Sequence, residues 1–173
     1  ANGLTFVLLV GDAAQIPVVE TSNGVSDISY GYLSGDDSYP ELFVGRFSAE
    51  NVGQVNTQVE RTKEYERDME SGDWLHKGMG VASNQCPINE NEYADEHMDN
   101  IRDDLLAYTY TEVDQIYDPT ASDTDVSEGL NDGRSIINYT GHGSETSWGT
   151  SGFNSADVNG LENDNMLSFI WSV

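Results

Sequence analysis

Short apolar runs that alternate with helical patterns constrain the fold of this chain more than any other sequence feature. Residues 4–10 are almost continuously apolar and rich in branched side chains, and Gly11-Asp12 ends the run abruptly. Such a run is typical of a strand that is buried on both faces. The same kind of pattern predicts further strands at residues 41–47, 78–83, 112–117, 134–140 and 167–173.

Helical spacing separates several of these runs. Apolar residues recur every three or four positions after Ser48, an N-cap candidate, which predicts a helix over residues 48–69. A second apolar stripe predicts a helix over residues 93–108, and shorter helices are expected at residues 125–130 and after Ser155, another cap candidate. Strand and helix in turn are the pattern of βαβ units. We therefore expect an α/β fold with a mostly parallel sheet and flanking helices.

Two features predict how the chain is divided. Residues 20–40 are polar and rich in Gly, Ser, Asp and Tyr, which predicts a long loop. Gly72-Asp73 breaks the first long helix and is the expected boundary between two parts, residues 1–72 and residues 73–173. The first residues lead straight into a strand pattern, and the chain stops inside an apolar run, residues 166–173. We therefore expect an internal segment of a longer, multidomain chain.

The charge of the chain excludes some classes of partner. Seven basic residues stand against 31 acidic ones, which gives a formal net charge of −24. This charge argues against nucleic acid and against anionic membrane surfaces as partners. A solvated acidic surface explains it, although acidic turns such as Gly35-Asp36-Asp37 and Asn89-Glu90-Asn91-Glu92 could also bind calcium through oxygen ligands. No apolar run approaches membrane-spanning length, so we expect no membrane insertion.

A histidine between two glycines is the strongest candidate for chemistry. Thr140-Gly141-His142-Gly143 directly follows the predicted strand at residues 134–140, and sites in open α/β sheets lie beyond the carboxyl ends of strands. The glycines let backbone approach a ligand closely and free the Gly143 N–H to donate. A turn whose histidine merely packs or caps is the alternative, and the pattern alone does not decide between the two.

At this motif the sequence resembles the gingipain family of cysteine peptidases. The run Asn138-Tyr-Thr-Gly-His-Gly-Ser-Glu-Thr-Ser-Trp-Gly-Thr150 is similar to the segment that carries the family's catalytic histidine. Further similar stretches occur in the same order over nearly the whole chain, at residues 7–12, 42–48, 59–67, 117–119 and 169–173. The resemblance implies a caspase-like fold, with residues 1–72 as the C-terminal part of the first peptidase subdomain. Residues 73–173 would then be the first part of the second, catalytic subdomain.

The resemblance also implies a mechanism based on a Cys–His pair. His142 would be the general base, and the Gly143 N–H would donate to the oxyanion. The family's nucleophile follows the last predicted strand, so we expect a cysteine about two residues beyond Val173. The single cysteine of the chain, Cys86, is a weaker candidate, because a lone free cysteine usually behaves as a small hydrophobic residue.

Two departures from the family pattern affect the expected site. The family often has a carboxylate after the Ala-Ser strand end, where this chain has Gln85 or Asn84. An amide can orient an imidazole but cannot stabilise imidazolium by charge. Arginine-specific gingipains have an aspartate three residues before the position of His97, and Ala94 stands there in this chain. The neighbouring Asp95 would point about 100° away on a helix, so arginine specificity is not supported.

Other site residues have both a structural and a functional interpretation. Trp148 could line the substrate cleft, but a packing role explains it equally well. Asp95 is kept as a substrate-binding candidate. His97 lies beside an apolar stripe and His76 at a strand start, and neither has a second histidine at metal-ligand spacing, so no zinc site is expected. The resemblance implies structural calcium but no cofactor for catalysis.

The sequence therefore predicts a cysteine endopeptidase that acts on polypeptide substrates. The resemblance implies a bacterial protein that is secreted or at the cell surface, and we expect it to be monomeric. A peptidase-like binding module without activity is one rival, for which Gln85 is the best support. A sorting transpeptidase of a secretion system, which joins chains instead of hydrolysing them, is another.

Overall fold

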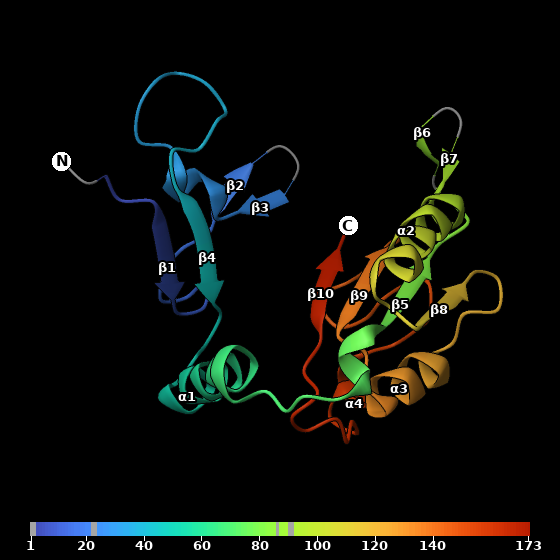
Figure 1. The fold of residues 1–173 in the computed structure, drawn as a ribbon. Helices are drawn as coiled ribbons and strands as arrows, with labels where there is room; N and C mark the ends of the chain where they lie inside the picture. Colours follow the sequence, from blue (N-terminus) through green and yellow to red (C-terminus); the bar gives the residue numbers. More distant parts are fainter. Residues whose placement is uncertain (1–2, 22–23, 86, 90–91) are drawn as a thin grey trace. The chain divides into compact units, whose positions relative to one another are not determined.

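The computed structural model describes residues 3–21, 24–85, 87–89 and 92–173, and it divides into two compact units (Figure 1). The first unit comprises residues 1–66 and the second residues 67–173. The division falls inside a π-helical turn, Glu64–Asp68, slightly before the predicted break at Gly72-Asp73. That the units correspond to two peptidase subdomains stays a prediction.

The first unit is built on a pair of parallel strands, β1 and β4, which are joined by a connection with its own short elements (Figure 1). Phe6 and Phe43 begin the paired register and stack on one another with ring centroids 5.2 Å apart. The elements of this unit are β1 (Phe6–Val10), β2 (Val19–Thr21), β3 (Gly24–Ser26), a 3-10 helix (Ile28–Gly31), β4 (Phe43–Phe47) and α1 (Val52–Lys63).

Three expectations for this unit are wrong in detail. The segment predicted as a long loop contains the antiparallel β2–β3 hairpin and the 3-10 helix. Asn51, not Ser48, caps α1, because the Asn51 side chain accepts the Gln54 N–H. Burial of β1 on both faces is not found either, because the alternate residues Phe6 and Leu8, which share one face, are 70% and 53% exposed.

The second unit contains a four-stranded sheet in which every pair of neighbouring strands is parallel, and a mostly parallel sheet is what the sequence pattern predicted. The strand order, which the sequence did not predict, is β10-β9-β5-β8. Its strands and helices lie close to their predicted bounds. One cap differs, since Asn154 rather than Ser155 caps α4. The elements are β5 (Lys77–Ala82), β6 (Pro87–Asn89), β7 (Glu92–Tyr93), α2 (Ala94–Tyr108), β8 (Glu112–Tyr117), α3 (Asp123–Asp132), β9 (Ile136–Thr140), α4 (Ser155–Val158) and β10 (Phe169–Ser172).

Alternate side chains along the strands pack into two hydrophobic cores, one on each face of the sheet. Val81 of β5 packs with Val126 and other residues on the α3 face, whereas Ala82 packs with Met98 on the α2 face. Gly80 lets α2 come close to the sheet, because a Cβ at that position would collide with the Met98 side chain. The helices on both faces thus follow from the alternation of side chains along β5.

The connections leave the carboxyl ends of these strands toward different faces. After β5 the chain leads to α2, whose residues pack on one face. After β8 and β9 it leads to α3 and to a loop whose Phe153 packs on the other face. Since β5 lies between β8 and β9, its carboxyl end becomes a crevice between diverging connections, which is where ligands bind in open α/β sheets.

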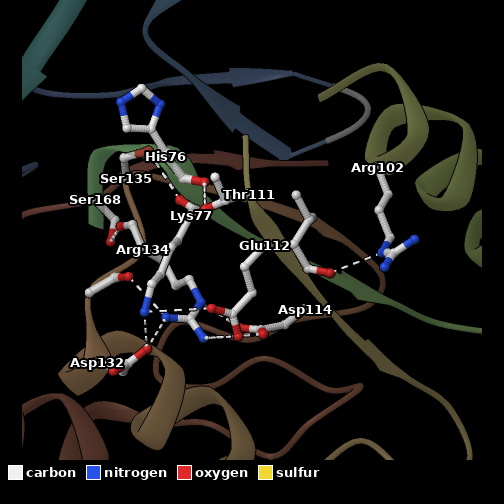
Figure 2. Close-up of polar contacts among 12 residues, drawn as sticks. His76, Lys77, Arg102, Thr111, Glu112, Asp114, Asp132, Arg134, Ser135 and Ser168 are labelled. Carbon is white, nitrogen blue, oxygen red and sulfur yellow. Dashed lines mark hydrogen bonds and ion pairs between the residues drawn. The ribbon is translucent and has the colours of Figure 1, made fainter. Parts of the chain in front are cut away.

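The opposite end of the sheet is held by charges around Arg134 (Figure 2). The Arg134 side chain is 5% exposed; its Nε donates to Asp114 at 2.6 Å and its Nη1 to Asp132 at 2.7 Å. Burial opposes the charge, but these hydrogen bonds outweigh it, and the pKa of Arg134 is raised. Lys77 and Glu112 complete the group, with Lys77 2.7 Å from Asp132. The Arg134 cluster thus joins β5, β8, α3 and the start of β9.

Candidate active site

The loop after β9 is held against the sheet by a buried tyrosine. Tyr139 is 1% exposed, and its hydroxyl donates to the His142 carbonyl at 2.5 Å. The same hydroxyl accepts the Thr150 N–H at 3.3 Å. Gly141 permits this close approach, because a Cβ there would lie 3.0 Å from the Tyr139 hydroxyl and 3.3 Å from Cβ of Ser83. The predicted general base is therefore fixed through its backbone at the carboxyl end of β9.

The backbone around His142 forms a narrow hairpin that leaves one donor unused. The Gly149 N–H donates to the His142 carbonyl at 2.6 Å, and the Ser144 N–H donates to the Ser147 carbonyl at 2.9 Å. Gly143 lies between these two bonds, and within the described residues its N–H takes part in neither of them. The geometry is compatible with Gly143 as an oxyanion donor, and this role stays a prediction.

The crevice at the end of β5 brings two of the predicted site residues together. It forms a pocket of about 240 Å³ that gathers residues from the ends of β5, β8 and β9. Gln85, whose N–H donates to the Ser83 hydroxyl at 3.1 Å, follows β5 and faces the same space as His142. The lining residues are Ser83, Gln85, Asp118, His142, Gly149 and Thr150.

Asp118 is a member of this site that the sequence reasoning did not select. It immediately follows β8, and its N–H donates to the Ala82 carbonyl at 3.1 Å. The signal was present in the sequence: a carboxylate directly after a strand predicted at residues 112–117, by the same rule that selected His142.

A second, smaller space of about 160 Å³ adjoins His142 on the other side. Ala94, the first residue of α2, is fully buried and lines this space together with Val173. No side-chain carboxylate is among its lining residues, which are Ser83, Ala94, Thr140, Gly141, His142 and Val173.

The other two predicted site residues lie apart from these spaces. Trp148 stacks on Tyr139 with ring centroids 4.5 Å apart and packs on the core of the α3 face. Asp95 lies in the first turn of α2, where its carboxylate accepts the Glu96 N–H at 3.0 Å. The structure thus shows a packing contact for Trp148 and a local hydrogen bond in the first turn of α2 for Asp95, and substrate contact stays a prediction for both.

The remaining histidines have structural partners. His97 lies 3.1 Å from the Glu92 carboxylate and lines a largely apolar pocket of about 410 Å³ with Ile101 and Trp171. His76 is exposed, and its Nδ1 lies 3.0 Å from the Thr109 carbonyl. Both positions agree with the boundary and surface roles expected for these residues.

Three further expectations concern Cys86, metal binding and membrane insertion. Cys86, the weaker nucleophile candidate, lies outside the described residues. Among residues 3–21, 24–85, 87–89 and 92–173, no group of three or more His, Cys, Asp or Glu side chains is placed to hold a metal ion. In the same part of the chain, no helix is both long and apolar enough to cross a bilayer.

Sequence comparison connects the chain with characterised peptidases. The sequence profile of Peptidase family C25 matches residues 1–173. Gingipain R2 of Porphyromonas gingivalis is 43% identical over 175 residues, which cover 99% of this chain and 24% of that protein. Lys-gingipain HG66 of the same organism is 30% identical over 169 residues, which cover 92% of this chain and 9% of that protein.

Structural comparison leads to the same family. The complex of the Porphyromonas gingivalis RgpB pro- and mature domains superimposes with a TM-score of 0.92 at 42% identity, covering 99% of this chain and 41% of that chain. The Arg specific cysteine proteinase gingipain R superimposes with a TM-score of 0.89 over 96% of this chain and 39% of that chain. The predicted caspase-like α/β fold is therefore confirmed. The chain spans less than half the length of these relatives, and it belongs to Peptidase family C25, the family of the gingipains.

Proposed function

We infer that the protein is a cysteine endopeptidase that hydrolyses peptide bonds in polypeptide substrates. His142 would take the proton of a cysteine thiol and return it to the leaving amine, and the Gly143 N–H would donate to the oxyanion of the tetrahedral intermediate. Membership of Peptidase family C25 supports the reaction class.

The register of β10 is the observation that carries this proposal. Parallel pairing sets Phe169 opposite Ile136 and Ser172 opposite Tyr139. If β10 continues in this register, the residue two positions beyond Val173 lies opposite His142. The nucleophile that the family resemblance places there would thus be next to its general base, at the ends of neighbouring strands.

The substrate preference differs from that of an arginine-specific enzyme. The space beside His142 is small, and Ala94 stands where the arginine-specific relatives of the resemblance have an aspartate. A substrate side chain entering this space would meet no carboxylate from the lining side chains, so a guanidinium would lose hydration without gaining a partner. We therefore expect cleavage after small, uncharged residues.

Cleavage-site mapping tests the proposal. The complete domain, extended beyond Val173 and freed of any propeptide, would be incubated with a mixed peptide library with and without a thiol alkylator, and products read by mass spectrometry. We expect alkylator-sensitive cleavage after small, uncharged residues. Cleavage only after arginine would contradict the proposed specificity, and folded protein without cleavage would favour the inactive binding module.

An added amine in the same assay separates hydrolysis from transpeptidation. Products that incorporate the amine in place of water would favour the sorting transpeptidase. Secretion or cell-surface location, structural calcium and the monomeric state rest on the family resemblance and stay predictions.

A further inference from the structure

We propose that Asp118 supplies the negative charge that stabilises the His142 imidazolium, a charge that the Gln85 amide cannot supply. The proposal rests on the proposed function, because an imidazolium forms only if His142 accepts a proton from a thiol. When the thiol proton moves to His142, the sulfur becomes negative and the imidazole positive. Asp118 exchanges no proton with His142 in this step. It would act through His142 and is therefore a positioning residue.

The backbone fixes Asp118 and His142 around one point, the carboxyl end of β5. The Asp118 N–H donates to the Ala82 carbonyl at 3.1 Å, and the Ser83 N–H donates to the Thr140 carbonyl at 2.9 Å. The end of β8 and the end of β9 are thus tied to two consecutive residues of the chain. Neighbouring strands lie about 4.8 Å apart, so the two strand ends are separated by about 10 Å. Side chains from both ends reach into the space between them.

That space is the 240 Å³ pocket, and its lining includes few ionisable side chains. Asp118 contributes the single carboxylate among the residues that line it. Asp118 is half-buried, and no other described side chain makes a hydrogen bond or ion pair with its carboxylate. The remaining lining residues of both spaces around His142 have no titratable side chain: Ser83, Gln85, Ala94, Thr140, Gly141, Gly149, Thr150 and Val173.

An unpaired carboxylate beside an imidazole favours the charged form of the ring. At the separation of about 10 Å between the two strand ends and an effective dielectric constant of about 20, this attraction changes an equilibrium by about ten- to twentyfold. Gln85 can orient the ring but has no charge to contribute. Asp118 would thus compensate for the amide at position 85, and the departure of this chain from the family pattern would not abolish activity.

Two substitutions test the proposal: one removes the negative charge at position 118, and the other adds a negative charge at position 85. In the complete domain, Asp118→Asn keeps the shape of the side chain and removes its charge. We expect kcat/KM at neutral pH to fall about tenfold. We also expect the alkaline midpoint of the kcat/KM profile to move to lower pH by about one pH unit, because the imidazolium loses its proton more readily. Gln85→Glu in the Asp118→Asn background should restore most of both quantities.

The controls separate electrostatics from folding and from failure of the proposed function. Asp104→Asn, on the exposed side of α2, removes the same charge elsewhere and should leave the midpoint unchanged. A structural role of Asp118 would lower the amplitude of the profile without moving its midpoint, and that result would overturn the inference. An unchanged profile in an active enzyme would also overturn it and leave the proposed function standing. Wild-type protein without alkylator-sensitive cleavage would overturn both.

Discussion

Replacing Arg134 by alanine should destabilise the second unit strongly. The Arg134 guanidinium donates to Asp114 at 2.6 and 3.2 Å, to Asp132 at 2.7 Å and to Glu112 at 3.3 Å. Breaking a buried ion pair costs about 3 to 5 kcal/mol, because the partner charge stays buried without compensation. Asp114 is 23% exposed, and Lys77 still contacts Asp132 at 2.7 Å in the variant. These two features reduce the expected loss of unfolding free energy to about 3 kcal/mol.

Chemical denaturation of the complete domain would measure this loss, as a lower midpoint with an unchanged slope. Arg102→Ala is the matched control: Arg102 is 31% exposed, and its Nε donates to the Val113 carbonyl at 3.0 Å (Figure 2). That variant should lose about 1 kcal/mol. The double variant Arg134→Met with Asp114→Leu should recover much of the stability, because it removes both charges of the Arg134–Asp114 pair. Equal losses in the Arg134→Ala and Arg102→Ala variants would show that the ion pairs of Arg134 do not stabilise the second unit.

Three further predictions concern the site loop, pH and salt. Tyr139→Phe removes the hydroxyl that contacts His142 and Thr150, and should lower the unfolding free energy by about 1 to 2 kcal/mol in denaturant titrations. Hydrogen bonds from Lys77 and then Arg134 lower the pKa of Asp132, so the unfolded state binds more protons and stability falls as pH drops below about 4. Asp132→Asn should therefore flatten the decrease of the denaturation midpoint at acidic pH; an equally steep decrease would count against the role of the pair. With a net charge of −24, the protein should melt at higher temperature when sodium chloride is raised from about 0.05 to about 0.5 M, and a lower melting temperature would contradict this.

The second unit was more predictable from the sequence than the first. Its strands are bounded by residues that favour turns, and the predicted strand at residues 112–117 matches β8 at both ends. In the first unit, the β2–β3 hairpin consists of strands of three residues among polar residues, too short to produce a periodic pattern. Ser48 and Asn51 are both good capping residues, and only the geometry decides that Asn51 accepts the Gln54 N–H.

The sequence could identify those site residues that directly follow the carboxyl end of a predicted strand. His142 was identified in this way, and Asp118 satisfies the same rule because it directly follows β8. What the sequence could not supply is the strand order. Because β5 lies between β8 and β9, residues that are far apart in the chain face one pocket with Gln85. Neither periodicity nor residue spacing determines which strands are neighbours.

The most direct test of the central claim compares the complete domain with its His142→Ala variant. Peptide cleavage by both proteins would be measured under single-turnover conditions, after denaturant titration has shown that the variant is folded. We expect the wild-type enzyme to cleave and the variant to lose turnover by at least about a thousandfold, because the thiol then has no base. Cleavage by the variant at a rate close to that of the wild type would contradict the assignment of His142 as general base.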